Sequence, residues 1–285
     1  MKIGSPEHKE LFCRSFIDSH VVYEPETLPW PALDELYLER MRGVPYWEEV
    51  FYAERRAGMV VQSFAKTVGD PLLREAIDLQ GFEEARHARL IRAMIDRYGV
   101  DAAERPVAAL PDDIETAFLD FGYGECADAF VGFGAFKLAR ESGFLPDAIF
   151  RLFDTFMQEE TRHIVFFVNW MAWREVNAGP FRAALRGATS ALYHGRAVGR
   201  HLKNARQEAK GGRNFSAAQA DIFPDGLDVR RFLGECLAEN ERRMSGFDPR
   251  LLRPRLMASI GRAVLAGAKL WPAKKPAGAP GSRAA

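Results

Sequence analysis

The 285-residue chain is 47% hydrophobic, which is typical of a globular protein with a sizeable core. Its 39 Lys and Arg residues balance 39 Asp and Glu residues, so no overall positive field favours nucleic acid as a partner. The three cysteines form no Cys-x-x-Cys motif, and neither a signal-peptide pattern nor a membrane-spanning apolar run occurs, so we expect a cytoplasmic protein.

Helical patterns predict an all-α fold that begins with an N-terminal arm over residues 1–45. Ser5 and Pro6 are typical of a helix start, and we expect short helices from there to about residue 18 and over residues 32–42. Apolar residues then recur at helical spacing between glycine and proline breaks. This pattern predicts four long helices at residues 46–68, 70–98, 112–142 and 147–177.

The rest of the chain is expected to add helices to a four-helix bundle formed by residues 46–178. Further helical segments are predicted at residues 181–209, 216–222, 227–244 and 249–270. They make up a C-terminal region, residues 179–271, that we expect to pack on the bundle. Residues 272–285 are rich in Pro, Ala, Lys and Gly, and this composition predicts a disordered tail.

A five-residue motif occurs twice within the long helical segments. Residues 83–87 read Glu-Glu-Ala-Arg-His, and residues 159–163 read Glu-Glu-Thr-Arg-His, so both copies contain Glu-x-x-His. Residues three apart lie on one face of a helix, which allows a carboxylate and an imidazole to bind the same ion. Two such pairs, with one lone glutamate from each of two further helices, are the ligand set of carboxylate-bridged dimetal bundles.

The first lone glutamate is predicted from the geometry of an antiparallel helix pair. Helices that are joined by a tight turn rise equally, so residues equidistant from the turn face each other. Reflection of Glu84 through Gly69 gives Glu54. Glu48 and Glu49 are competitors, but they would face residues more than one turn past Glu84, and Glu54 is therefore preferred.

The second lone glutamate follows from the same geometry. Reflection of Glu160 through the turn at residues 142–143 gives Glu125. Four converging carboxylates would repel one another unless two divalent cations balanced their charge. Oxygen donors with one imidazole per metal suit iron or manganese better than structural zinc. The predicted metal ligands are Glu54, Glu84, His87, Glu125, Glu160 and His163.

This ordered set resembles the ligands of the ferritin-like superfamily of non-haem di-iron carboxylate proteins, over residues 46–177. The resemblance implies a ferritin-like bundle with two iron ions, or manganese at one or both sites. It further implies an O2-dependent oxidoreductase that hydroxylates, desaturates or N-oxygenates a small, largely apolar organic substrate. The sequence has no Gly-x-Gly-x-x-Gly nucleotide motif, so electrons are expected from an external reductase or ferredoxin.

Two alternatives belong to other functional classes. The first is a metal-handling protein that acts as a ferroxidase, peroxide scavenger or iron store without an organic substrate. The second is a non-catalytic helical scaffold. A cavity beside the metals that fits an organic molecule would distinguish the oxidoreductase from the metal-handling protein.

Several features near the predicted ligands have two interpretations. Glu83 and Glu159 either accept hydrogen bonds from the imidazoles, or face solvent or pair with Arg86, Arg89 or Arg162, and Asp128 and Asp154 are alternative acceptors. Glycines in the third long helix either allow close packing or leave a cavity lined by phenylalanines. These glycines are Gly122, Gly124, Gly132 and Gly134.

Two features of the C-terminal region are also open. His194 and His201 lie seven residues apart on one helix face. They either provide an extra ligand or proton relay for the site, or are ordinary helix-surface or packing residues. Residues 250–271 are basic and amphipathic. They would rest on an anionic membrane surface, or pack on the bundle or on the second subunit of a homodimer.

Overall fold

The computed structural model describes residues 1–210, 222–224 and 227–269, and these are helical with connecting turns and loops. No strand occurs in those ranges. The predicted all-α class is therefore confirmed for the described residues. Most of the helix expected at residues 216–222, and the whole tail at residues 272–285, lie outside them.

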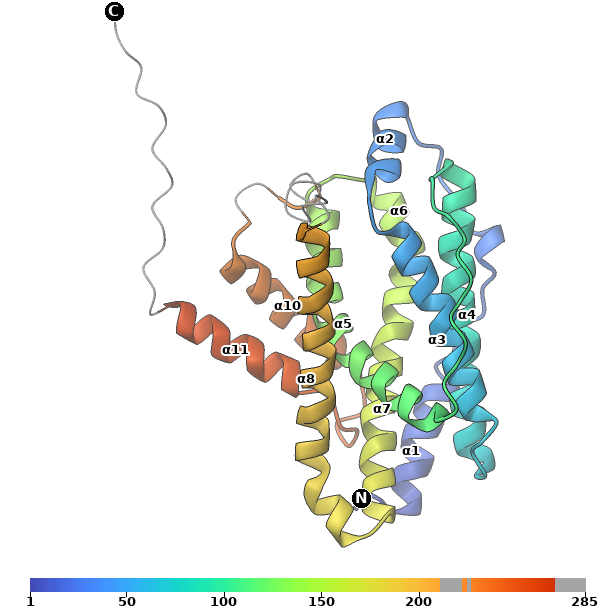
Figure 1. Ribbon diagram of the computed structural model, residues 1–285, viewed down its shortest axis with the longest axis vertical. Helices are drawn as coiled ribbons and strands as arrows, with labels where there is room; N and C mark the ends of the chain where they lie inside the picture. The colour runs from blue at the N-terminus through green and yellow to red at the C-terminus, as the bar shows by residue number, and fades with distance from the viewer. Residues whose placement is uncertain (211–221, 225–226, 270–285) are drawn as a thin grey trace, which may run out of the picture.

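Helices α3, α4, α5 and α7 pack on one another within a helical bundle (Figure 1). Helices α3 and α4 run antiparallel and lie side by side, while α5 packs on both α3 and α7. Their inner faces bury a continuous apolar core that includes Val61, Ile77, Phe118 and Phe167. The bounds of the four helices are Trp47–Ala65 for α3, Pro71–Tyr98 for α4, Ile114–Glu141 for α5 and Asp154–Asn177 for α7.

Helix α4 has sequence signals at both ends. The Asp70 carboxylate accepts hydrogen bonds from the backbone N–H groups of Leu72 and Leu73, and Pro71 occupies the first turn, where a missing N–H costs nothing. At the other end Gly99 has φ 61°, a left-handed conformation that glycine adopts without steric cost. These signals set the register of the helix that contains the first motif.

Three expected helices differ from the observed ones. The single helix expected at residues 147–177 is divided at Phe153 into α6 (Asp147–Leu152) and α7, because the Phe153 N–H bonds to the Phe150 carbonyl only three residues back. The helix expected from residue 249 begins later, as α11 (Leu256–Lys269), because Pro254 disfavours helical geometry at the residue before it. The helix expected from residue 32 begins at Glu35.

The N-terminal arm lies across the two helices that contain the motif. Helix α1 (Pro6–Ile17) packs on α4 and α7, and the 3-10 turn η1 (Pro25–Thr27) also contacts α4. The buried His8 ring is hydrogen-bonded to the Asn169 side chain of α7, 3.0 Å away. A further short helix, α2 (Glu35–Gly43), follows and contacts α4.

Three C-terminal helices cover the bundle on the side of α5. Helix α8 (Pro180–Lys210) packs on α5 and α7, α10 (Val229–Met244) packs on α5, and α11 contacts α10 and α5. Helix α11 therefore rests on the bundle, although its Ile260 and Val264 side chains are exposed. Among the described residues, no helix combines the length and the apolar character that crossing a bilayer requires.

Candidate metal centre

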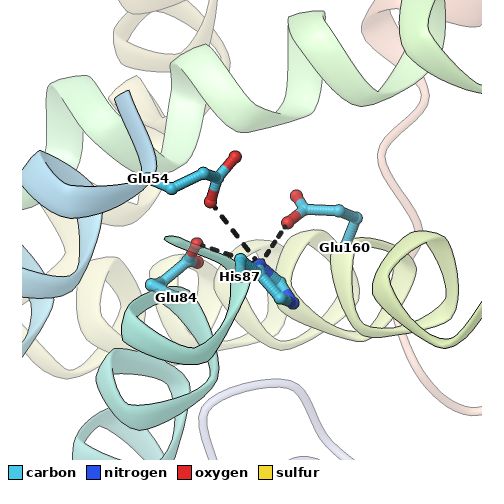
Figure 2. Close-up of side chains that lie close together, drawn as sticks. All are labelled: Glu54, Glu84, His87 and Glu160. Atoms are coloured by element: carbon cyan, nitrogen blue, oxygen red, sulfur yellow. Dashed lines mark ion pairs between the residues drawn. The ribbon is translucent and has the colours of Figure 1, made fainter. Parts of the chain in front are cut away.

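The six predicted ligands come together at the centre of the bundle. They form two overlapping groups, and within each group the candidate donor atoms lie within 4.8 Å of one another. One group is Glu54, Glu84, His87 and Glu160 (Figure 2), and the other is Glu84, Glu125, Glu160 and His163. Glu84 of α4 and Glu160 of α7 belong to both groups. The structure thus provides two adjacent sites that share two carboxylates.

Each imidazole directs its Nδ1 atom at the shared carboxylates. His87 Nδ1 lies 3.1 Å from Glu160 Oε1, and 3.5 Å from one oxygen each of Glu54 and Glu84. Figure 2 shows these three carboxylates pointing at the His87 ring from α3, α4 and α7. His163 Nδ1 lies 2.9 Å from Glu84 Oε1 and 3.9 Å from Glu160 Oε1.

Several donor atoms of the cluster are buried and lack a hydrogen-bond partner within the described part of the chain. A buried polar atom without a partner costs about 1–3 kcal/mol, so such atoms are rare in folded proteins. Five in one place indicate that something outside the polypeptide satisfies them. The atoms are Glu84 Oε2, His87 Nδ1, Glu125 Oε2, Glu160 Oε1 and His163 Nδ1. All five are metal-ligating types, and the residues therefore fit two metal ions.

Burial and the closeness of the charged groups also shift the pKa values of the cluster. Burial raises the pKa of Glu54 to about 8 and raises the pKa of Glu125 well above its usual range, and neighbouring carboxylates add to both shifts. Burial opposes a charged His163, but Glu84 and Glu83 outweigh it and raise the pKa of this imidazole to about 10. Protons thus balance the carboxylate charge in the metal-free protein, and metal ions would replace them.

The second nitrogen of each imidazole bonds to a glutamate of the other motif copy. His87 Nε2–H donates to Glu159 Oε2 and His163 Nε2–H donates to Glu83 Oε2, each over 2.9 Å. An ionised carboxylate only accepts, so these bonds place a proton on each Nε2, and Nδ1 is the ring nitrogen that faces the cluster and would bind a metal ion. Glu83 and Glu159 therefore accept hydrogen bonds from the imidazoles, which was one interpretation of them. Each glutamate accepts from the histidine of the other helix and not from the histidine of its own motif copy.

The alternative interpretation, pairing with arginine, is observed at the same glutamates. Arg86 forms an ion pair with Glu159, and Arg162 Nη1 lies 2.9 Å from Glu83 Oε1. Burial alone would raise the pKa of Glu83, but His163 and Arg162 outweigh burial and hold it at about 2. These ion pairs are buried, so Glu83 and Glu159 do not face solvent.

The two aspartates considered as alternative acceptors take other positions. Asp154 lies 3.0 Å from Arg140 Nη1 on the protein surface. Asp128 is exposed. The acceptors of the imidazole N–H groups are the glutamates of the motif.

Residues of the N-terminal arm also contact Glu83 and Glu159, and the sequence analysis did not identify these arm residues. The His20 ring donates to Glu83, and the Tyr23 hydroxyl lies 3.5 Å from Glu159 Oε2. His20, Glu83 and Glu159 also form a third group of potential metal ligands. Arg86 and Arg162 already balance these two carboxylates, so this third group needs no metal. No spacing in the sequence relates the arm to the motif.

His194 of α8 takes no part in the cluster. His194 is buried against Tyr123, with Nδ1 2.8 Å from the Ser190 carbonyl oxygen, and burial lowers its pKa. It is a packing residue, one of the two roles considered for it. The side chain of His201 lies outside the described residues.

A cavity of about 480 Å³ adjoins the cluster, and Glu54, Glu125 and Glu160 lie in its wall. Glu54 and Glu125 are half-buried because they face this space, whereas Glu84 and both ligand histidines are fully buried behind them. The remaining wall is mainly aliphatic and aromatic, from α3, α5, α6 and α7. The cluster therefore has one side open to an apolar cavity and one side closed by the N-terminal arm.

The glycines of α5 serve both of the purposes considered for them. A Cβ atom at Gly122 would lie 2.2 Å from the Phe167 ring, and one at Gly134 would lie 2.8 Å from the backbone of Cys236, so both allow close packing. Gly132, in contrast, lines the cavity, and a Cβ atom there would meet nothing within 4 Å.

The fold and the site together define a helical-bundle protein with a buried cluster of four carboxylates and two imidazoles. No family model, curated protein or solved structure matches the chain. Functional inference therefore depends on the chemistry of this cluster and of the cavity beside it.

The exchanged imidazole contacts predict which site each outer glutamate supports. We expect Glu159→Gln to weaken metal binding at the His87 site roughly tenfold or more, because loss of a charged partner frees the ring and lowers its basicity. In a calorimetric manganese(II) titration, Glu159→Gln should add little to His87→Ala but its full effect to His163→Ala. Exposed Glu75→Gln on α4 is the matched control. Equal effects in both backgrounds would contradict the exchange.

Proposed function

We propose that the protein is a ferritin-like di-iron carboxylate protein and acts as an O2-dependent oxidoreductase on a small, largely apolar organic molecule. The observation that carries the proposal is the position of the cluster. Buried donor atoms without hydrogen-bond partners, counted over the described residues, form one cluster, and Glu54, Glu125 and Glu160 of this cluster line a largely apolar cavity large enough for an organic ligand.

The donor set matches two iron or manganese ions in number and in charge. Glu54, Glu84, His87 and Glu160 would hold one ion, and Glu84, Glu125, Glu160 and His163 would hold the other. Four carboxylates balance two divalent cations, and one imidazole per ion with oxygen donors favours iron or manganese over zinc. When bound, the two ions would supply the reduction of O2 that oxidises the substrate.

The residues of the chain itself would bind the metal ions, orient the imidazoles and the substrate, and exclude water. Glu84 and Glu160 would keep the two ions adjacent because each faces both sites. Glu83 and Glu159 fix the imidazole orientation through the Nε2–H bonds. The apolar wall would exclude water and present the substrate to the Glu54, Glu125 and Glu160 side of the cluster. Electrons would come from a separate reductase or ferredoxin.

The cavity favours this function over that of an iron store or ferroxidase. Apart from a few carboxylates, the space beside the cluster is lined mainly by aliphatic and aromatic side chains, which offer no ligand atoms to a metal ion. Pockets of this size and character are typical of sites for small organic ligands. An apolar substrate gives such a wall a purpose that metal handling alone does not.

Iron loading and O2 exposure test the proposal. We expect the purified chain to take up about two Fe(II) per molecule anaerobically, and the loaded protein to consume O2 with a change in its absorption spectrum. The double variant His87→Ala, His163→Ala should do neither. The proposal fails if neither iron nor manganese binds, or if loaded protein leaves O2 untouched. Uptake of many irons per chain would support a store instead.

A further inference from the structure

Helix α11 packs on the rest of the protein through a narrow face. Ala258 and Gly261 are buried, and a Cβ atom at Gly261 would lie 2.9 Å from the Phe130 ring, so this glycine lets α11 approach α5 closely. Most of the other described positions of α11 are exposed. Figure 1 shows the helix extending out from the bundle, with its C-terminal end away from α3, α4 and α7. Much of the surface of α11 therefore faces away from the bundle.

The exposed part of α11 has apolar side chains. Ile260 and Val264 are 43% and 47% exposed, and they lie one turn apart on the same side of the helix. Ala263 and Gly267, also exposed, follow the same side. A helix of 14 residues is only marginally stable without packing, and contiguous exposed apolar residues mark contact surfaces. This side of α11 is thus expected to bind a partner.

Basic residues run along another edge of the exposed surface. Arg255 and Arg262 are exposed and seven residues apart, which is close to two helical turns. The Ser259 N–H donates to the Arg255 carbonyl over 2.9 Å, so Arg255 belongs to the first turn. At 100° per residue, the small residues Ala263 and Ala266 lie between this basic edge and the apolar edge. Small residues in the middle allow the helix to lie against a flat surface.

The sequence around α11 concentrates positive charge. Residues 249–285 contain eight of the 39 Lys and Arg residues of the chain and none of its 39 Asp and Glu residues. Three of these eight, Lys274, Lys275 and Arg283, lie beyond the described residues. The chain as a whole has no net charge, so this segment is a local positive region that an anionic surface attracts.

An anionic lipid surface matches this combination better than two other partners. A second copy of the chain would bring the same positive region to the contact and be repelled. Nucleic acid would pair its phosphates with the arginines but would leave Ile260 and Val264 in water. The edge of a bilayer takes cations at its headgroups and apolar side chains at its acyl chains. Trp271, two residues beyond α11 in the sequence, is of a type enriched at membrane–water interfaces.

We propose that α11 binds the surface of an anionic membrane, with Ile260 and Val264 at the boundary between headgroups and acyl chains and with Arg255 and Arg262 on the lipid phosphates. The helix begins at Leu256, after Pro254, so the proline does not interrupt this surface. Ala258 and Gly261 hold a different side of α11 on the bundle, and the helix would contact the bundle and the membrane at once. This contact goes beyond the proposed function and does not depend on the metal ions.

Co-sedimentation of the full-length protein with vesicles tests the electrostatic part. We expect vesicles of equimolar phosphatidylglycerol and phosphatidylcholine to bind roughly tenfold or more tightly than vesicles of phosphatidylcholine alone. Arg255→Gln with Arg262→Gln should weaken this binding roughly tenfold or more, since each basic residue near an anionic surface contributes on the order of fivefold. Arg14→Gln with Arg151→Gln removes the same charge from exposed positions on α1 and α6 and should change nothing. Equal binding to both kinds of vesicle would overturn the proposal.

A second double variant tests the apolar part. Ile260→Ser with Val264→Ser keeps every charge and should also weaken binding to the anionic vesicles roughly tenfold or more, because no apolar side chain then enters the acyl region. Val22→Ser with Leu36→Ser alters two exposed apolar residues of the N-terminal arm and is the matched control. Circular dichroism confirms the helical content of each variant. Wild-type binding by the Ile260→Ser, Val264→Ser variant would contradict the proposed insertion.

Two further measurements report the other partners. Sedimentation velocity should give the same mass for the wild type and the Ile260→Ser, Val264→Ser variant. A wild-type dimer that this variant loses would assign the apolar side to a second copy of the chain. Duplex DNA should bind more weakly than anionic vesicles at the same phosphate concentration. Tighter binding of DNA would assign the arginines to nucleic acid, and either result would overturn the proposal.

Discussion

Replacing either shared glutamate should remove both metal ions, whereas replacing either lone glutamate should remove one. Glu84 and Glu160 each face both sites, while Glu54 faces only the His87 site and Glu125 only the His163 site. Elemental analysis after desalting should give about two ions per chain for the wild type. It should give close to none for Glu84→Ala or Glu160→Ala, and about one for Glu54→Ala or Glu125→Ala.

Controls for this experiment come from the same helix and the same sites. Exposed Glu75→Ala on α4 should keep both ions. The single variants His87→Ala and His163→Ala should each lose one ion, because each imidazole serves one site. If Glu84→Ala retained one ion as firmly as Glu54→Ala does, the two sites would not share carboxylates and the dimetal arrangement would be wrong.

The convergence of the six residues could be predicted from the sequence because the turns are well defined. Asp70 and Pro71 fix the start of α4, and Gly143, with φ 67°, follows the end of α5. With both turns located, equal rise along antiparallel helices places Glu54 opposite Glu84 and Glu125 opposite Glu160. The structure brings both pairs into one cluster, even though α6 and α7 are separate helices.

The exchanged outer contacts could not be predicted in this way. Glu83 and His87 are four residues apart on one helix, so local geometry favours a contact between them. Glu83 instead accepts from His163, because the approach of α4 to α7 brings the two copies of the motif together. Which helix supplies the partner is a property of tertiary packing, and neither spacing nor composition encodes it.

The sequence predicts the cavity only as one of two alternatives, because tertiary packing decides between them. Glycine and phenylalanine content in α5 indicates either tight packing or open space, and the choice depends on what approaches each glycine. Phe167 approaches Gly122 and Cys236 approaches Gly134, whereas the space beside Gly132 stays open. The side chains that decide this come from other helices, far away in the sequence.

The closed side of the cluster is held by a buried arginine. Arg86 is fully buried, forms an ion pair with Glu159, donates to the Val21 carbonyl over 2.9 Å and stacks 4.0 Å from the Tyr23 ring centroid. A single side chain thus connects the N-terminal arm to the carboxylate that orients His87. Its removal would loosen the arm and the metal centre together.

We therefore expect Arg86→Met to lower the free energy of unfolding by about 3–5 kcal/mol, the usual cost of leaving one member of a buried ion pair without its partner. Arg89→Met is the matched control. It removes a partly exposed arginine of the same helix that pairs with Glu24 and Glu26, and such surface pairs contribute at most about 1 kcal/mol.

Urea denaturation of the metal-free protein, followed by circular dichroism, measures both variants with a common reference. Metal-free samples isolate the effect of the ion pair from any change in metal affinity. Similar losses in Arg86→Met and Arg89→Met would show that the buried pair contributes no more than a surface pair. A large loss in Arg86→Met alone would show that the arm and the outer shell of the cluster are stabilised together through this arginine.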